Sequence, residues 1–237
     1  MKFSFPWRPL KAPPPQIIRN IAYTPHPLKP ETWLGDYKID TLLSQTRSGY
    51  TYTANGGAAL VQEYFPRDIA IRDSDGTSVL LYDEAANPSY EHGLSQFLLL
   101  ARILSQIDHP GRVVHYQEQN DTAWYAINFE PRASVGDLLG TGKRLPETAL
   151  QSVLTAALIY LDAAHQNGIF HLELGPRQLI LSAEKELVVC GFNVARLRGP
   201  DLRENDAAYY FAPEHLHTAG RLGAWSDFYS LGTILYH

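Results

Sequence analysis

The chain has a single cysteine, Cys190, and no long apolar run. One cysteine excludes an internal disulfide framework and a zinc site of several thiolates, and it fits a reducing compartment. The apolar stretch FLLLARIL, residues 97–104, is interrupted by Arg102 and is far shorter than the roughly 20 residues that cross a bilayer. We therefore expect a cytoplasmic protein that does not insert into a membrane.

Basic charge is also scarce. The 20 lysines and arginines are outnumbered by 25 acidic residues, for a formal net charge of -5. No basic stripe is present, so we expect no nucleic-acid partner. Lys2 is not followed by a continuous apolar segment, and a secretory signal is therefore not expected either.

The hydrophobic content, 45% of 237 residues, is enough for a substantial buried core. Eight of the 16 prolines lie in residues 1–30, a composition that sustains neither a helix nor a central strand. Residues 1–33 are therefore predicted to form a Pro-rich arm. Its apolar side chains indicate that part of the arm lies against the folded body, or alternatively that it docks a partner.

Beyond the arm, the pattern changes from strands to helices. Residues 34–65 contain β-branched and aromatic residues punctuated by SGY and NGG, which predicts antiparallel hairpins. Residues 90–110 have apolar positions at helical spacing and end at Pro110, which predicts an amphipathic helix. We also expect a strand at 124–129, a helix at about 147–167 that ends on Gly168, short strands (LILS, LVVC), and a last helix from about residue 226.

Six segments carry a family resemblance in the same order along the chain. They are LGDYKIDTLLSQTRSGYTY (34–52), LVQEYFP (60–66), HLELGPRQL (171–179), GFN (191–193), APE (212–214) and SDFYSLG (226–232). From residue 34 onward the chain resembles the protein kinase fold, most closely the bacterial serine/threonine (Hanks-type) family. This implies a two-lobed α+β fold, with a β-rich N-lobe at 34–130 and a mainly helical, partial C-lobe at 131–237 that ends in the central helix.

The resemblance also shows which chemical groups are missing. Phosphoryl transfer needs positioned phosphates, metal ions and an orienting carboxylate. The glycines of the family's phosphate loop align with Ser44, Thr46 and Gly49, so two are lost, and Thr46 would narrow the space above the phosphates. The third-strand lysine aligns with Gln62 and its glutamate partner on the helix with Leu100.

These last two losses are mutually consistent, because either charge alone would be buried and unpaired. We therefore expect an apolar lobe interface at this point. Leu60 stands where the family has a small alanine against the adenine ring, and it would fill part of the nucleotide slot.

The catalytic-loop and DFG positions are changed as well. Glu173 replaces the orienting aspartate, Gly175 the lysine, and Gln178 the metal-binding asparagine. Gly191 replaces the DFG aspartate that holds the metal, and Asn193 replaces the final glycine. The change at Gly191 is decisive, since glycine has no ligand and hard cations such as Mg²⁺ are bound by oxygen atoms.

The family's scaffold positions, by contrast, are retained. His171, Phe192 and Leu104 match the apolar column that links the two lobes, and Glu214 matches a structural glutamate of the APE segment. Asp227 matches the central-helix aspartate that holds the catalytic loop by its backbone. The sequence therefore predicts a pseudokinase that uses no cofactor and has no catalytic, cofactor-binding or metal-binding residues.

The expected role is that of a protein-interaction scaffold or allosteric regulator in bacterial signalling or a secretion-associated assembly. The expected partner is a protein: an active kinase, a substrate, an assembly component, or a second copy bound through the central helix. The alternative is a weakly active or nucleotide-sensing serine/threonine kinase relative, because Glu173 keeps a carboxylate. The fold implies further helices after His237, and without them the central-helix face of Phe228, Leu231, Ile234 and Leu235 would need cover from elsewhere.

Overall fold

The computed structural model describes residues 26–142, 146–194, 209–216 and 220–236. Most of the predicted arm, residues 1–25, lies outside these ranges. Within them, Leu28 is buried and its backbone N–H donates a 2.9 Å hydrogen bond to the Tyr52 hydroxyl. The part of the arm that can be described therefore lies against the folded body, as its apolar content predicts.

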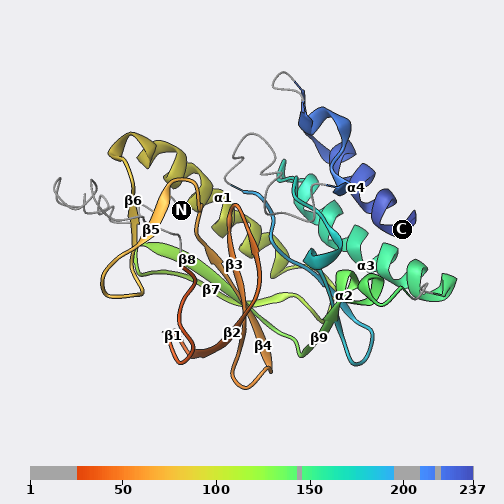
Figure 1. Ribbon diagram of the computed structural model, residues 1–237, viewed down its shortest axis with the longest axis horizontal. Coiled ribbons are helices and arrows are strands. Elements are labelled where there is room, and N and C mark those ends of the chain that lie inside the picture. The colour runs from red at the N-terminus through yellow and green to blue at the C-terminus, as the bar shows by residue number, and fades with distance from the viewer. Residues whose placement is uncertain (1–25, 143–145, 195–208, 217–219, 237) are drawn as a thin grey trace.

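The N-lobe is built on one antiparallel sheet of six strands in the order β1-β2-β3-β4-β8-β7 (Figure 1). A separate hairpin of β5 and β6 accompanies it. The strands are β1 (Trp33–Leu34), β2 (Tyr37–Thr46), β3 (Gly49–Ala54), β4 (Ala59–Tyr64), β5 (Ala70–Arg72), β6 (Val79–Leu81), β7 (Val113–Gln119) and β8 (Thr122–Asn128).

The predicted hairpins are confirmed, and the turns have the expected residues. Asn55, Gly56 and Gly57 all have positive φ in the β3–β4 turn, which is the conformation that glycine and asparagine tolerate best. At the start of β3, a Cβ on Gly49 would lie 1.9 Å from the carbonyl oxygen of Glu63. Gly49 thus lets β3 run close against β4.

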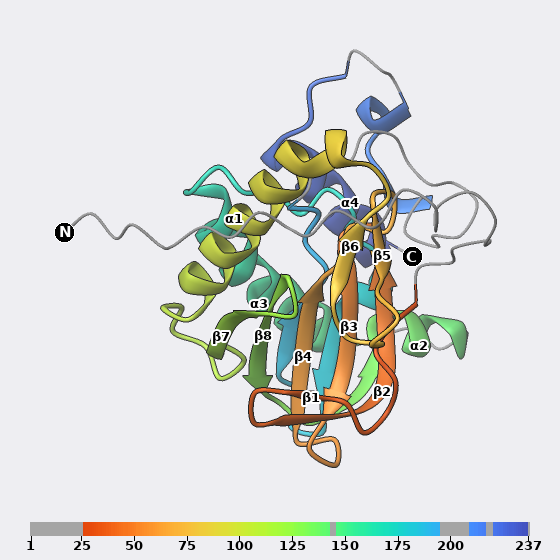
Figure 2. The ribbon, with the colours of Figure 1, turned by 90° about the vertical axis from the view of Figure 1, so that its left-hand side faces the viewer.

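Helix α1 (Asn87–Leu104) follows a short 3-10 turn (Glu84–Ala86) and packs on one face of the sheet (Figure 2). Its buried side includes Tyr90, Phe97, Leu100 and Leu104. The prediction that this helix runs to Pro110 is wrong, because the Ser105 hydroxyl donates to the carbonyl of Arg102 and turns follow. Ile107 is buried all the same, from a non-helical position.

The C-lobe is mainly helical, as predicted, with one small antiparallel sheet in the order β11-β10-β9. Helix α3 packs against both β11 and α4, and Gly168, with φ 71°, follows it as its predicted stop. The helices are α2 (Val135–Gly140), α3 (Glu147–His165) and α4 (Ala224–Tyr236), the strands β9 (Pro131–Ser134), β10 (Leu179–Ser182) and β11 (Leu187–Val189), and the 3-10 turns Pro176–Gln178 and Pro213–Leu216.

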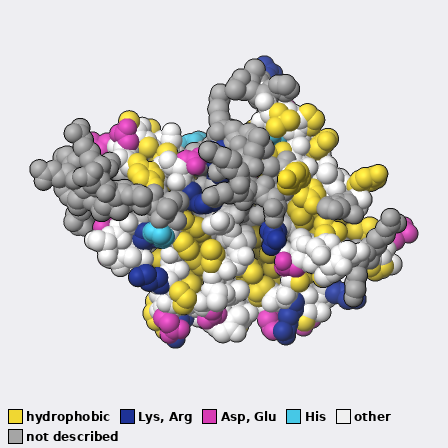
Figure 3. Space-filling model, in the orientation of Figure 1, with side chains coloured by type: hydrophobic (Ala, Val, Ile, Leu, Met, Phe, Trp, Pro, Cys, Tyr) yellow, Lys and Arg dark blue, Asp and Glu magenta, His cyan; other side chains and the backbone are white. Residues whose placement is uncertain are grey.

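The central helix, α4, is better covered than its sequence predicts. Leu231 and Ile234 are each only 2% exposed because they pack into the core, so the prediction that they need external cover is wrong. Figure 3 shows hydrophobic side chains at the surface in the upper right of the view. Aromatic side chains of α4 remain accessible, and Phe228 of the predicted face is one of them. They are Trp225, Phe228, Tyr229 and Tyr236.

None of the helices in the described ranges combines the length and the apolar character that crossing a membrane requires.

Candidate functional site

Asp227 of α4 holds the catalytic-loop segment, residues 171–179, through two hydrogen bonds to its backbone. Its Oδ2 accepts a 2.7 Å hydrogen bond from the backbone N–H of His171, and its Oδ1 accepts another of 2.7 Å from Leu172. His165, in the last turn of α3, places Nε2 2.8 Å from Oδ2. Leu172 has a positive φ of 60°, an unfavourable conformation for leucine that these contacts help to hold. The predicted role of Asp227 is confirmed.

His171 links this loop to the GFN segment. The ring is fully buried, and this burial lowers the pKa of the imidazole, so the neutral form is favoured. Nε2 lies 2.9 Å from the carbonyl oxygen of Cys190, which only accepts hydrogen bonds, so Nε2 carries the proton. Nδ1 in turn accepts from the N–H of Glu173. The ring also packs on Phe192, with centroids 4.5 Å apart, as the predicted apolar column requires.

Glu173 is held by groups from both lobes. Oε2 accepts a 3.2 Å hydrogen bond from the backbone N–H of Arg47, and Oε1 accepts one of 3.1 Å from the amide nitrogen of Asn193. Burial raises the pKa of the Glu173 carboxyl to about 7, against the opposing effect of the Arg47 contact. Both oxygens of the carboxylate are thus engaged by the protein itself.

Gly191 meets the phosphate-loop strand directly. A Cβ at this position would lie 2.7 Å from the methyl carbon Cγ2 of Thr46 and 3.3 Å from Cγ of Gln178. Gly191 also has φ of 80°, which disfavours any residue with a side chain. Thr46 therefore lies directly against Gly191, and a side chain at position 191 would meet its methyl group. The narrowing of the space above the phosphates stays a prediction.

Gln62 is tied to its neighbours as a neutral polar group. Its Nε2 donates to the hydroxyl of Thr51 at 3.0 Å, and its Oε1 accepts from the hydroxyl of Tyr125 at 2.5 Å. Leu100 packs into the hydrophobic core. The predicted apolar interface is thus only half right, because Gln62 is buried with its hydrogen bonds satisfied by two side chains that the sequence did not point to.

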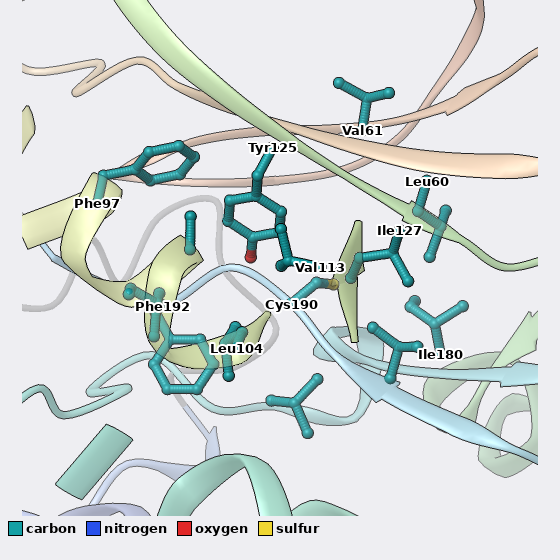
Figure 4. Packing of buried hydrophobic residues seen from close by; sticks show 14 of the residues in the cluster. Leu60, Val61, Phe97, Leu104, Val113, Tyr125, Ile127, Ile180, Cys190 and Phe192 are labelled. Atoms are coloured by element: carbon teal, nitrogen blue, oxygen red, sulfur yellow. The ribbon is translucent and has the colours of Figure 1, made fainter. Parts of the chain in front are cut away.

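Leu60, which is predicted to fill part of the nucleotide slot, lies in the packed core. Leu60 is 1% exposed and is paired with Ile127 of β8 across the sheet. Figure 4 shows Leu60, Ile127, Ile180 and Cys190 within one packed apolar cluster. Burial raises the pKa of the Cys190 thiol to about 12, so this group stays protonated and unreactive.

A small hollow lies behind the phosphate-loop hairpin. Its volume of about 10 Å³ is enough for roughly one water molecule. It is lined by residues of β2, β3, β4, α1 and the GFN segment: Thr46, Ser48, Gly49, Tyr50, Thr51, Gln62, Glu63, Phe97, Gly191 and Phe192.

These residues do not fit a metal-bound nucleotide triphosphate. Gly191 has no ligand atom, and Glu173 is occupied by Arg47 and Asn193. The remaining oxygen is Oε1 of Gln178, which is buried and has no hydrogen-bond partner among the described residues. One neutral amide oxygen is a poor anchor for Mg²⁺, which usually takes carboxylate ligands together with phosphate oxygens. Within the described ranges, no three acidic, histidine or cysteine side chains come close enough together to hold a metal ion.

Several residues of the site were missed by sequence reasoning. Ser48 donates a 2.9 Å hydrogen bond to Oδ1 of Asn193 from the opposite lobe. Asn193 does not adopt a positive φ, so its importance lies in its side chain and not in backbone freedom. A polar residue in a tight turn normally faces water, and no pattern in the sequence indicates that Ser48 is buried.

A second missed feature is a buried ion pair in the N-lobe. Arg72 of β5 donates to both oxygens of Glu63, at 2.7 and 2.9 Å, and its guanidinium lies 4.6 Å from the centroid of the Phe65 ring. Tyr52 adds a third hydrogen bond to Glu63, and Tyr52 is also the acceptor for Leu28. This network joins the arm to the sheet on the side away from Gln62, since alternate residues of β4 face opposite sides.

Known proteins match this chain over much of its length. The protein kinase domain family matches residues 90–237. The serine/threonine-protein kinase PknB of Mycobacterium leprae is 26% identical over 193 residues, which cover 76% of this chain and 30% of that protein. The serine/threonine-protein kinase pkn2 of Myxococcus xanthus is 28% identical over 194 residues, which cover 76% of this chain and 23% of that protein.

A plant protein is also similar. The serine/threonine-protein kinase RUNKEL of Arabidopsis thaliana is 26% identical over 142 residues, 57% of this chain and 10% of that protein. The chain thus spans less than a third of the length of these relatives. The family match covers more than half of the chain, and the sheet, the helices and the anchored catalytic loop agree with it. This chain belongs to the protein kinase domain family.

Proposed function

We propose that this chain is a pseudokinase, a kinase-like domain that does not transfer phosphate and serves as a scaffold or allosteric regulator. The observation that carries the proposal is the contact between Thr46 and Gly191, where the phosphate-loop strand occupies the space of a metal-binding carboxylate. Phosphoryl transfer depends on charge compensation by metal ions and cationic groups. Position 191 provides no side-chain carboxylate for the metal, and the Arg47 guanidinium at the cleft is paired with Asp68.

The contacts that the cleft retains support the role of a scaffold. The fold is intact around the catalytic loop, while the groups that face a nucleotide have become contacts within the chain. A stable shape without chemistry can act only through what it binds. The exposed aromatic residues Trp225, Phe228 and Tyr229 on α4 are typical of a surface that packs against protein, either further helices of the same fold or a partner. We place this role in bacterial signalling or a secretion-associated assembly, in a cytoplasmic setting.

The second candidate is a nucleotide-sensing relative that binds ATP in a non-standard way. Two observations favour it: the buried, unpartnered Oε1 of Gln178, and the retained carboxylate of Glu173. Against it stands the apolar packing around Leu60.

A thermal-shift titration separates the two candidates. The chain is titrated with ATP alone, with ATP and Mg²⁺, and with ATP and Mn²⁺. Because a ligand that binds only the folded state raises Tm by mass action, a pseudokinase without a nucleotide site should show no saturable rise in Tm. A saturable rise that requires the metal would overturn the proposal. The variant Gln178→Leu is the control, since loss of such a rise in it would assign binding to the cleft and support nucleotide sensing.

A further inference from the structure

The turn between β2 and β3 reaches across the cleft and bonds to the C-lobe. The backbone N–H of Arg47 donates to Oε2 of Glu173 at 3.2 Å, and the hydroxyl of Ser48 donates to Oδ1 of Asn193 at 2.9 Å. The amide nitrogen of Asn193 then donates to Oε1 of Glu173 at 3.1 Å. We call this closed set of four residues the latch.

The latch is desolvated. Ser48, Glu173 and Asn193 are 5%, 4% and 4% exposed. Polar groups at such depth are costly to leave unpaired, so each hydrogen bond of the set depends on the others. Opening the lobes at this point would expose or orphan several groups together, which makes the latch cooperative.

Both ends of the latch are anchored in their own lobes. In the N-lobe, the carbonyls of Arg47 and Ser48 accept hydrogen bonds from Arg67 and Phe65, and the Arg47 side chain forms an ion pair with Asp68. In the C-lobe, the N–H of Asn193 donates 2.8 Å to the carbonyl of His171, which Asp227 holds in place. The latch therefore joins two anchored segments, one in each lobe, and is more than a local turn contact.

We infer that the latch is an intramolecular substitute for a nucleotide: the chain's own β2–β3 turn holds the two lobes closed without any ligand. This inference rests on the proposed function, because it takes the turn, and not a bound phosphate, to be the resident of the cleft. Its consequence is that a partner meets one lobe arrangement, which does not respond to ATP. An event that disrupts the latch would free the lobes to separate and alter the surface that the partner recognises.

The distance between the lobes tests the inference directly. Spin labels are placed on cysteines introduced at two exposed positions, Glu118→Cys on β7 and Ser152→Cys on α3. Cys190 is buried and stays unlabelled. Double electron–electron resonance on the parent should give one narrow distance distribution, unchanged by ATP with Mg²⁺. Ser48→Ala should broaden this distribution and move it to longer distances.

The matched control is Thr41→Val. It removes a hydroxyl that contacts Thr53 at 3.0 Å within the same hairpin but does not cross the cleft, so the distribution should stay narrow. Equal distributions for Ser48→Ala and Thr41→Val would overturn the latch and leave the proposed function standing. A shift of the parent distribution on adding ATP with Mg²⁺ would instead overturn the proposed function.

Hydrogen exchange on the parent provides a measurement that needs no latch variant to fold. The Arg47 N–H should be protected, since it donates to a buried carboxylate. In Ser48→Ala its exchange should be faster by roughly tenfold or more, the factor expected when a cooperating hydrogen bond is lost. An Arg47 amide in the parent that exchanges as fast as an unprotected one would refute the latch.

Discussion

The two sides of the catalytic loop differ in their contacts and in how far the sequence predicts those contacts. On the side of α4, Asp227 holds the backbone of His171 and Leu172 as the family pattern predicts. On the side of the cleft, Glu173 and Asn193 are bonded to the β2–β3 turn, in a place where an active family member would bind phosphates. One side makes the contacts that the family pattern predicts, and on the other side the polar groups bond to the chain's own β2–β3 turn.

The difference separates contacts that stabilise the loop from groups that would face a ligand. Contacts that stabilise the loop are needed whether or not a nucleotide binds, so their replacement would cost folding free energy. Groups that would face only a ligand carry no such cost, so in the proposed pseudokinase other residues can fill their space. Thr46 and Gly191 are such a pair, since the methyl group of one occupies the place of the missing side chain of the other.

The largest loss of stability is expected when the hydrogen bonds from Asp227 on the α4 side of the loop are removed. Asp227→Ala leaves two buried backbone N–H groups without an acceptor, so the free energy of unfolding should fall by about 3–5 kcal/mol. Urea denaturation followed by circular dichroism measures this loss. The control Asp162→Ala removes an exposed carboxylate of α3 that accepts a hydrogen bond from the Gln166 side chain, and it should change the free energy by about 0.5 kcal/mol or less. Similar losses in both variants would contradict the anchoring role of Asp227.

The next effect tests the complementarity of Thr46 and Gly191. Gly191→Ala should lower the free energy of unfolding by about 3–4 kcal/mol, because positive φ and the contact with Thr46 both oppose a Cβ. Adding Thr46→Ser removes the methyl group in the way, and it should recover about 1–2 kcal/mol of this loss.

Gly56→Ala is the matched control for this pair. Gly56 has φ of 69° and open space where its Cβ would be, so only backbone strain, about 1–2 kcal/mol, should appear. The interpretation fails if Thr46→Ser gives no more recovery with Gly191→Ala than it gives in the parent.

The smallest effect is a pH dependence of stability that comes from Glu173 on the cleft side of the loop. The pKa of Glu173 is raised to about 7 by burial, above its ordinary value of 4.5, so the folded state holds the proton longer than the unfolded state. Stability from this group is therefore complete below about pH 4.5, falls as pH rises, and levels off above about pH 7. Relative to Glu173→Gln, the parent should lose no more than about 3 kcal/mol across this window.

The measurement is the free energy of unfolding of parent and variant at a series of pH values. Glu184→Gln, at an exposed position, controls for the loss of a glutamate in general. A parent-minus-variant difference that rises with pH would show that the hydrogen bonds from Arg47 and Asn193, and not desolvation, dominate the titration of Glu173.

Much of the fold could be predicted from local patterns. The NGG turn, the helix before Gly168 and the order of the kinase-like segments all come from neighbouring residues, and all are confirmed. The predicted end of α1 lies too far along the chain. Pro110 is the stop signal that the sequence shows, although the helix already ends before Ser105, where the chain turns. The cover of Leu231 and Ile234 was missed for a similar reason, since a helix taken alone does not show what packs on it.

The candidate site divides in the same way. The predicted narrowing by Thr46 follows from residue types at matched positions, and so does the missing ligand at Gly191. The hydrogen bonds of Gln62 to Thr51 and Tyr125 could not be predicted, because strand pairing and side-chain direction decide them. The buried pair of Arg72 and Glu63 was missed because an arginine in a short strand usually faces solvent.

Residue identity alone establishes that the cleft lacks a carboxylate at position 191, since glycine has no side chain. What fills the cleft is a matter of three-dimensional packing. Ser48 and Asn193 are 145 residues apart, and Arg47 and Glu173 are 126 apart. Contacts at such separations form only when the whole fold brings two lobes together, because the entropy lost in joining distant segments is offset by the core as a whole and not by the few bonds that result.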